Sequence, residues 1–152
     1  KSLISIIVLS LILTNCGFKP IYNSKNTNFQ ILEIKNKFEN KNSFMIENMV
    51  MALSNKDALK KLKLEIDYKQ SLTTILKNSK GDPSKKKISI IVNLIVKNES
   101  NNVLTNKIFN EEFSYAVQSD KFNMSKYENN ITNNLNNKIT NDIIFLLGTI
   151  EW

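Results

Sequence analysis

The only cysteine of this chain, Cys16, lies just after a strongly apolar segment, residues 3–13, and is followed by Gly17 and Phe18. A single cysteine forms neither an internal disulfide nor a thiolate cage for zinc. Histidine, the commonest metal ligand and the usual acid–base group near neutral pH, is absent. Arginine is absent as well, so the chain has no bidentate grip on phosphate or carboxylate. These absences argue against an enzyme, a metal site or another cofactor.

The apolar segment has the architecture of a secretory signal. Lys1 supplies a positive charge, and residues 3–13 would span only about 16 Å as a helix, too little for a hydrocarbon core about 30 Å thick. The alternative is a buried strand or core helix with an incidental cysteine. Charge, length and position together favour the signal.

The tetrapeptide LTNC, which ends at Cys16, resembles the lipobox of bacterial lipoproteins, with Asn15 where Gly, Ala or Ser is usual. The resemblance implies that residues 1–15 are a signal peptide, that the Cys16 thiol receives a diacylglyceryl group, and that the amine freed by cleavage is acylated. Each buried acyl methylene contributes about 0.8 kcal/mol to anchoring. Gly17, in place of the aspartate that often marks retention in the inner membrane, implies the outer membrane.

The sequence after the signal predicts a short lipidated tether, residues 16–28, and a single α+β domain, residues 29–152. Apolar patterns predict strands over 29–37, 61–73, 87–97 and 103–118, and helices over 43–55 and 120–147. The expected architecture is a four-stranded, mixed and mostly antiparallel sheet with two helices packed on one face, in the order β-α-β-β-β-α.

Three finer expectations follow from these patterns. Ser43 or Asn42 is the expected N-cap of the first helix. Ile91 and Ile95 point away from the main apolar face of their strand, so this strand is expected to be central and partly covered on both faces. The apolar residues of the last strand, 103–118, change parity, which predicts a bulge.

The segment from Cys16 to Leu147 resembles one family. The motif CGFKPIY, residues 16–22, is similar to the opening of LptE-family lipoproteins of lipopolysaccharide (LPS) assembly. The strand KLKLEIDY, the apolar hairpin, and a strand ending in SY before a long final helix fit the same pattern. The resemblance implies a periplasm-facing outer-membrane lipoprotein that partners an LptD-like β-barrel as plug and assembly factor, and that takes part in inserting LPS into the outer leaflet.

Lysines are concentrated in the segment 77–87, which is expected to be a loop with a turn at its tip. Under the LptE resemblance, the hypothesis is that this loop meets phosphates of lipid A, or an acidic surface inside the barrel, through Lys80, Lys85, Lys86 and Lys87. The alternative is a solvated loop, because charge runs usually only keep a turn in water. Nucleic-acid binding is not expected despite the net charge of +7, since no aromatic–basic motif accompanies the scattered lysines.

Two other interpretations remain open. An auxiliary lipoprotein subunit of an envelope lipid transporter would share the anchor and the small domain, but its partner would be an inner-membrane complex. A small lipoprotein hydrolase would have to use residues such as Ser114, Tyr115, Asp120 or Lys121, and neither a histidine nor a G-x-S-x-G motif supports it.

Overall fold

The computed structural model describes residues 27–37 and 40–151. In chain order its elements are β1 (Phe29–Asn36), α2 (Lys41–Met51), β2 (Lys60–Lys77), β3 (Pro83–Asn98), β4 (Val103–Ala116) and α3 (Lys121–Thr149). Every predicted strand and helix is present, and β2 and β3 extend beyond their apolar patterns. Cys16, the predicted signal peptide and most of the predicted tether lie outside the described residues.

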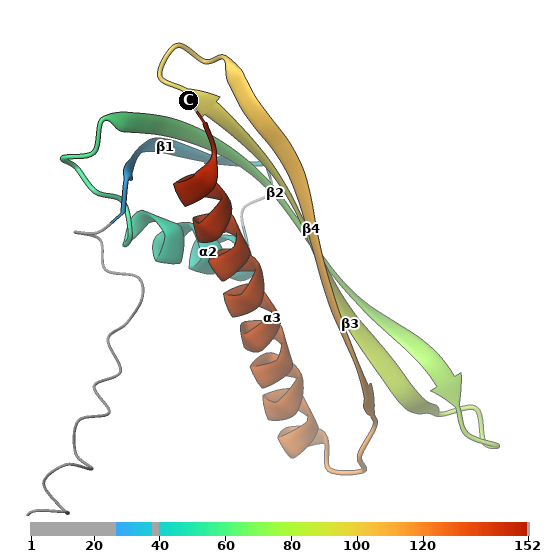
Figure 1. Ribbon diagram of the computed structural model, residues 1–152. Helices are drawn as coiled ribbons and strands as arrows, with labels where there is room; N and C mark the ends of the chain where they lie inside the picture. Colours follow the sequence, from blue (N-terminus) through green and yellow to red (C-terminus); the bar gives the residue numbers. More distant parts are fainter. Residues whose placement is uncertain (1–26, 38–39, 152) are drawn as a thin grey trace, which may run out of the picture.

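The four strands form one sheet in the order β1-β2-β3-β4. Strand β1 runs parallel to β2, whereas β2–β3 and β3–β4 are antiparallel hairpins. A parallel neighbour requires a crossover, and the segment containing α2 supplies it. Both helices lie on the same side of the sheet, with the long α3 running along it (Figure 1). This arrangement confirms the predicted fold class.

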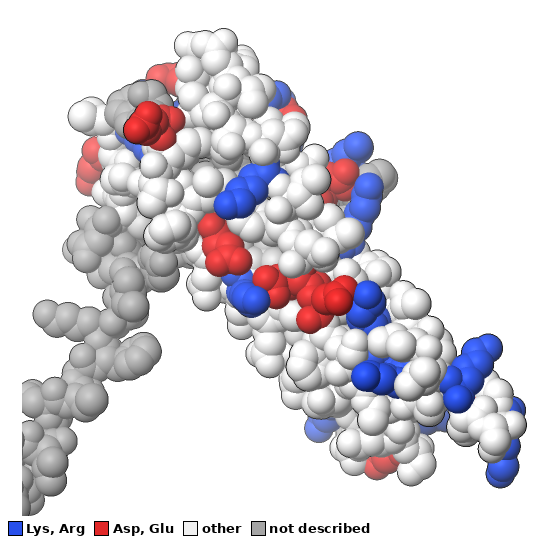
Figure 2. Space-filling view, turned by 45° about the vertical axis from the view of Figure 1, so that its right-hand side comes forward, with Lys and Arg blue, Asp and Glu red and all other residues white. Residues whose placement is uncertain are grey.

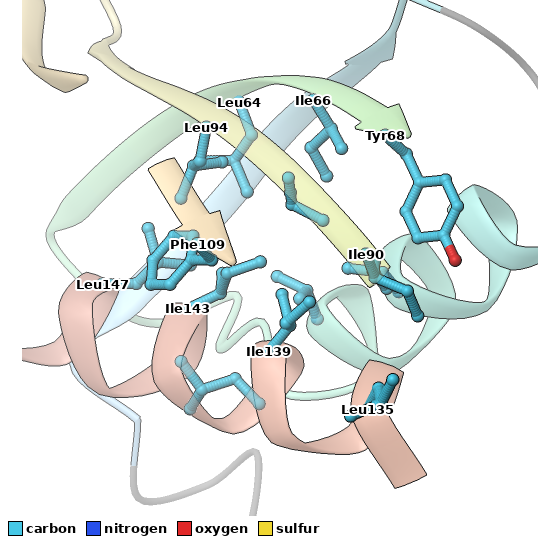
Figure 3. Close-up of a cluster of buried hydrophobic side chains, with 14 of the residues drawn as sticks. Leu64, Ile66, Tyr68, Ile90, Leu94, Phe109, Leu135, Ile139, Ile143 and Leu147 are labelled. Atoms are coloured by element: carbon cyan, nitrogen blue, oxygen red, sulfur yellow. The ribbon is translucent and has the colours of Figure 1, made fainter. Parts of the chain in front are cut away.

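The core fills the layer between the sheet and the helices. Strand alternation sends every second residue of β2 and β3 toward the helices, and α3 contributes the predicted apolar stripe. The side chains that meet in this layer include Leu64, Ile66, Ile90, Leu94, Phe109, Leu135, Ile139, Ile143 and Leu147 (Figure 3). Asparagine is a poor helix former, so the asparagine-rich α3 depends on burying this stripe.

The N-cap of α2 is Asn40, so the prediction of Ser43 or Asn42 was wrong. Asn40 Oδ1 accepts hydrogen bonds from the backbone N–H of Asn42 at 3.0 Å and of Ser43 at 2.9 Å. Ser43 Oγ in turn accepts from the backbone N–H of Asn40 at 3.0 Å, which completes a reciprocal capping box. The prediction failed because it placed the cap next to the first apolar residue, whereas the first turn of α2 is polar.

Strand β3 is central, as predicted, but in the described part of the chain helices cover only one of its faces. Both helices lie over the face that carries Ile90 and Leu94 (Figures 1 and 3). Ile91, on the other face, is 40% exposed. Ile95, on the same face, is half-buried, so the expected partial cover of both faces is confirmed at Ile95 and wrong at Ile91. We call this uncovered surface the open face.

The predicted bulge in the last strand is confirmed at its start. Val96 pairs with Thr105 and Lys97 pairs with Val103, so Leu104 is the extra residue in β4. The bulge allows Leu104 to pack against the core although its parity is opposite to that of the later core residues of β4.

Candidate functional site

The β2–β3 hairpin projects away from α3 and forms one end of the molecule, at the lower right of Figure 1. Its turn is organised by Asn78, whose Oδ1 accepts hydrogen bonds from the backbone N–H of Lys80 and of Asp82, both at 2.9 Å. Gly81 has a φ of 87°, the left-handed region that favours glycine. We call residues 69–87 the distal hairpin.

The four predicted lysines do not form one loop cluster. Lys80 lies in the turn, but Lys77 ends β2 and residues 83–87 belong to β3, so the prediction that 77–87 is a loop was wrong outside 78–82. Along a strand, successive side chains point to opposite faces. Lys85 and Lys87 therefore lie on the open face and Lys86 on the helix-covered face. The lysine run carried no apolar pattern from which its strand structure could have been read.

Two of these lysines are engaged in ion pairs. Lys86 Nζ lies 3.4 Å from Glu128 Oε1 on α3, and Lys87 Nζ lies 2.8 Å from Glu112 Oε2 on β4. Glu128 also accepts a hydrogen bond from the Tyr115 hydroxyl. Burial raises the pKa of Tyr115 above its ordinary range, and the hydrogen bond to Glu128 raises that pKa further. Lys86 and its neighbours thus hold the start of α3 against the sheet.

Three other lysines of the distal hairpin have no ion-pair partner in the described part of the chain. Lys77, Lys80 and Lys85 have no carboxylate within ion-pair distance among the described residues. Lysines are prominent at this end of the molecule in the space-filling view, at the lower right of Figure 2. An exposed ammonium attracts anionic groups by a Coulombic force that weakens as salt screens it.

Exposed apolar side chains accompany these lysines. Leu72, Ile75 and Leu76 are 51%, 42% and 56% exposed. Beside the turn of the hairpin, a groove of about 650 Å³ lies between the hairpin, the end of β4 and the start of α3, with Val117 and Met124 among its apolar lining. Apolar surface beside unpaired cations suits an amphiphile with anionic groups. The three apolar residues were not predicted as a site, because their only signal in the sequence is the loss of strict alternation after β2 leaves the core.

Among the residues considered for a hydrolase, Tyr115 and Asp120 have structural roles, and Ser114 has no catalytic partner in the described part of the chain. The Tyr115 hydroxyl is bound to Glu128, and Asp120 caps α3 by accepting from the backbone N–H of Phe122 at 3.0 Å and of Asn123 at 3.1 Å. The hydrogen bond from the Asn123 backbone lowers the pKa of Asp120. Ser114 lies exposed in β4, with no hydrogen bond from its hydroxyl within the described chain.

Among residues 27–37 and 40–151, no group of three or more His, Cys, Asp or Glu side chains is placed to hold a metal ion. No helix in the same ranges is both long enough and apolar enough to cross a membrane.

No protein-family model matches this chain, and no curated protein matches it in sequence. Solved structures do match its fold. An uncharacterized lipoprotein B of Nitrosomonas europaea has a TM-score of 0.63 at 8% identity, covering 87% of this chain and 90% of that chain. The rare lipoprotein B of Shewanella oneidensis has a TM-score of 0.58 at 11% identity, covering 76% of this chain and 90% of that one. A minor lipoprotein of Acinetobacter baumannii has a TM-score of 0.57 at 9% identity, covering 78% and 90%. This chain therefore has the fold of these bacterial lipoproteins.

Proposed function

We propose that this chain is an outer-membrane lipoprotein, anchored through lipids on Cys16, that partners an LptD-like β-barrel in inserting LPS into the outer leaflet. The observation that carries the proposal is the fold shared with three bacterial lipoproteins over most of the chain. The CGFKPIY opening, which resembles that of the LptE family, points the same way. In this role the domain binds and positions its partners and performs no reaction.

The distal hairpin is the part of the domain that we assign to LPS. Lipid A combines phosphate groups with acyl chains, and the hairpin combines unpaired lysines with exposed apolar side chains. Lys86 and Lys87 already form ion pairs with carboxylates of the same chain. Of the four lysines singled out in the sequence, Lys80 and Lys85 therefore suit this role better. Lys77, the last residue of β2, joins them.

The assignment predicts a local effect of charge removal. We expect Lys77→Gln, Lys80→Gln and Lys85→Gln, combined, to weaken LPS binding by the detergent-solubilised full chain several-fold at low salt. The loss should shrink as added salt screens the phosphates. The matched control neutralises Lys41, Lys56 and Lys107, exposed lysines elsewhere on the domain, and so changes the net charge equally. Equal losses in both variants would indicate that overall charge, not the hairpin, attracts LPS.

The proposed function as a whole is tested by co-purification. A C-terminal tag on the full chain, extracted from its own membranes in mild detergent, should recover an outer-membrane β-barrel in a fixed ratio. Mass spectrometry of the same sample should find Cys16 as a lipidated N-terminus. Recovery of an inner-membrane ATP-driven transporter instead would favour the auxiliary-subunit alternative. An unmodified Cys16 thiol with the preceding segment still attached would rule out the anchor.

A further inference from the structure

The open face of the sheet has an apolar centre. The antiparallel register places Asn93 of β3 opposite Asp67 of β2 on one side and opposite Ile108 of β4 on the other. Ile91 and Ile95 flank Asn93 along β3, so both are diagonal neighbours of Ile108 on the same face. Ile108 is 66% exposed and Ile91 40%. Three isoleucines thus form an apolar patch in the middle of a surface that no described element covers.

Hydrogen-bond acceptors without donors lie beside this patch. Asp67 Oδ1 and Asn93 Oδ1 are buried atoms with no hydrogen-bond partner within the described part of the chain. The other carboxylate oxygen of Asp67 faces Lys37 at 3.6 Å and Lys69 at 3.8 Å. Asp67 and Asn93, together with Ile95, line a hollow of about 360 Å³ in the sheet surface. Because a buried acceptor is costly when unpaired, a surface that brings N–H donors into this hollow would be favoured.

The surroundings of the patch carry an excess of positive charge. Glu65, Asp67 and Glu112 are each paired with at least one lysine of this chain. Lys63 and Lys85, on the same face, have no carboxylate within ion-pair distance among the described residues. A second copy of this chain would therefore set surplus lysines against surplus lysines. An anionic lipid would bring further acceptors to Asp67 and Asn93, which need donors.

We propose that the open face docks on an acidic surface of another protein, with Ile91, Ile95 and Ile108 as apolar anchors and with donors of that protein reaching Asp67 and Asn93. An apolar centre inside a charged rim is the usual anatomy of a protein–protein interface. The identification of this protein with the β-barrel rests on the proposed function. The docking face itself follows from the register, burial and charge of the sheet.

The test uses the full chain in its own membranes, with photoreactive benzoylphenylalanine at position 91. We expect an adduct to a protein, through a peptide rich in Asp and Glu. The same probe at Phe122, which is 70% exposed in the first turn of α3, should give at least about tenfold less adduct. Adducts to lipid or LPS from position 91, or equal protein adducts from both positions, would overturn the proposal.

A second measurement separates docking from folding. The variant Ile91→Ser/Ile108→Ser should recover about tenfold less of the cross-linked protein, because both anchors lose their apolar surface. Its thermal midpoint should stay close to that of the parent chain, since both residues are exposed. The control Phe122→Ser should recover the partner normally. Undiminished recovery of the β-barrel by the double variant would sink the docking face and leave the proposed function standing. An acidic protein that is not a β-barrel, cross-linked at position 91 and lost in the double variant, would support the docking face and overturn the proposed function.

Discussion

From Lys60 to Tyr68, strand β2 alternates buried and partly exposed residues, whereas from Lys69 to Lys77 every residue of the same strand is exposed. Pairing with β3 does not explain the difference, because β3 accompanies β2 along nearly its whole length. The difference follows from the other neighbours of β2, because β1 pairs only with residues 60–66 and α2 lies at the same end of the sheet (Figure 1). The proximal half of β2 therefore helps to form the core, and the distal half presents its side chains to solvent.

The comparison separates stability from binding along one strand. The proximal half contributes apolar burial, which dominates the free energy of folding. The distal half keeps a hydrogen-bonded backbone but little buried apolar surface, which is typical of segments that open locally at low cost. Exposed leucines, isoleucines and lysines can be placed there for a ligand without disturbing the core.

The largest expected difference in the free energy of unfolding is between alanine variants of two leucines on the same face of β2. Leu64 is 1% exposed and Leu72 is 51% exposed. We expect Leu64→Ala to lower the free energy of unfolding by about 2–5 kcal/mol, through lost transfer energy and a cavity in the core. Leu72→Ala should lower it by about 1 kcal/mol or less. Urea denaturation followed by circular dichroism measures both, and similar losses would mean that the distal half shares in the core.

An intermediate effect is expected where the two halves of β2 meet. The Tyr68 hydroxyl donates to Asn136 Oδ1 on α3 at 3.1 Å, and Asn136, which is fully buried, has no partner for its Nδ2 among the described residues. Tyr68→Phe would leave both polar ends of that amide unpaired. We expect a loss of about 1–3 kcal/mol in the free energy of unfolding. Tyr127→Phe, at a 41% exposed tyrosine, is the control and should change little.

The same hydroxyl predicts a pH dependence. Burial raises the pKa of Tyr68 from 10.0 to about 12. Between these values, the unfolded phenol loses its proton while the folded phenol keeps it, so the free energy of unfolding falls as pH rises through this range. The advantage of the parent chain over Tyr68→Phe should therefore shrink from pH 10 to pH 12. An advantage that stays constant would show that the phenol is not buried as described.

The sequence predicted the elements of the fold because its periodicities report which face of a strand or helix is buried. Strand β2 and the stripe of α3 are the clearest cases. Periodicity could not show what covers a face: isoleucines 91 and 95 look the same in sequence whether they meet a second layer or solvent. It also could not place the cap at Asn40, since a polar first turn separates that residue from the apolar pattern.

The candidate site was predicted only in part. The lysines of 77–87 were recognised, but their division between two faces depends on β3 reaching Pro83. Which of them are paired depends on Glu112 and Glu128, carboxylates distant in sequence that only the folded chain brings near. The covalent role of Cys16 stays a prediction, since that residue lies outside the described part of the chain.

The smallest expected effect concerns the turn of the distal hairpin. Gly81 has a φ of 87°, and a Cβ added there would meet no atom within 4 Å, so Gly81→Ala would introduce backbone strain alone. That strain amounts to about 1–2 kcal/mol. If the distal hairpin opens independently of the core, its amides should exchange with solvent about 5–30 times faster, while the amides of the proximal half keep their rates.

Hydrogen exchange measured peptide by peptide resolves the two halves, and Gly148→Ala in α3 is the matched control. A Cβ at Gly148 also meets no atom within 4 Å, but its φ lies outside the left-handed region, so alanine there should stabilise the helix slightly. If Gly81→Ala accelerated exchange equally at the distal and proximal amides, both halves of β2 would open as one cooperative unit. Acceleration confined to the hairpin would mean that this end can rearrange around a ligand while the core remains closed.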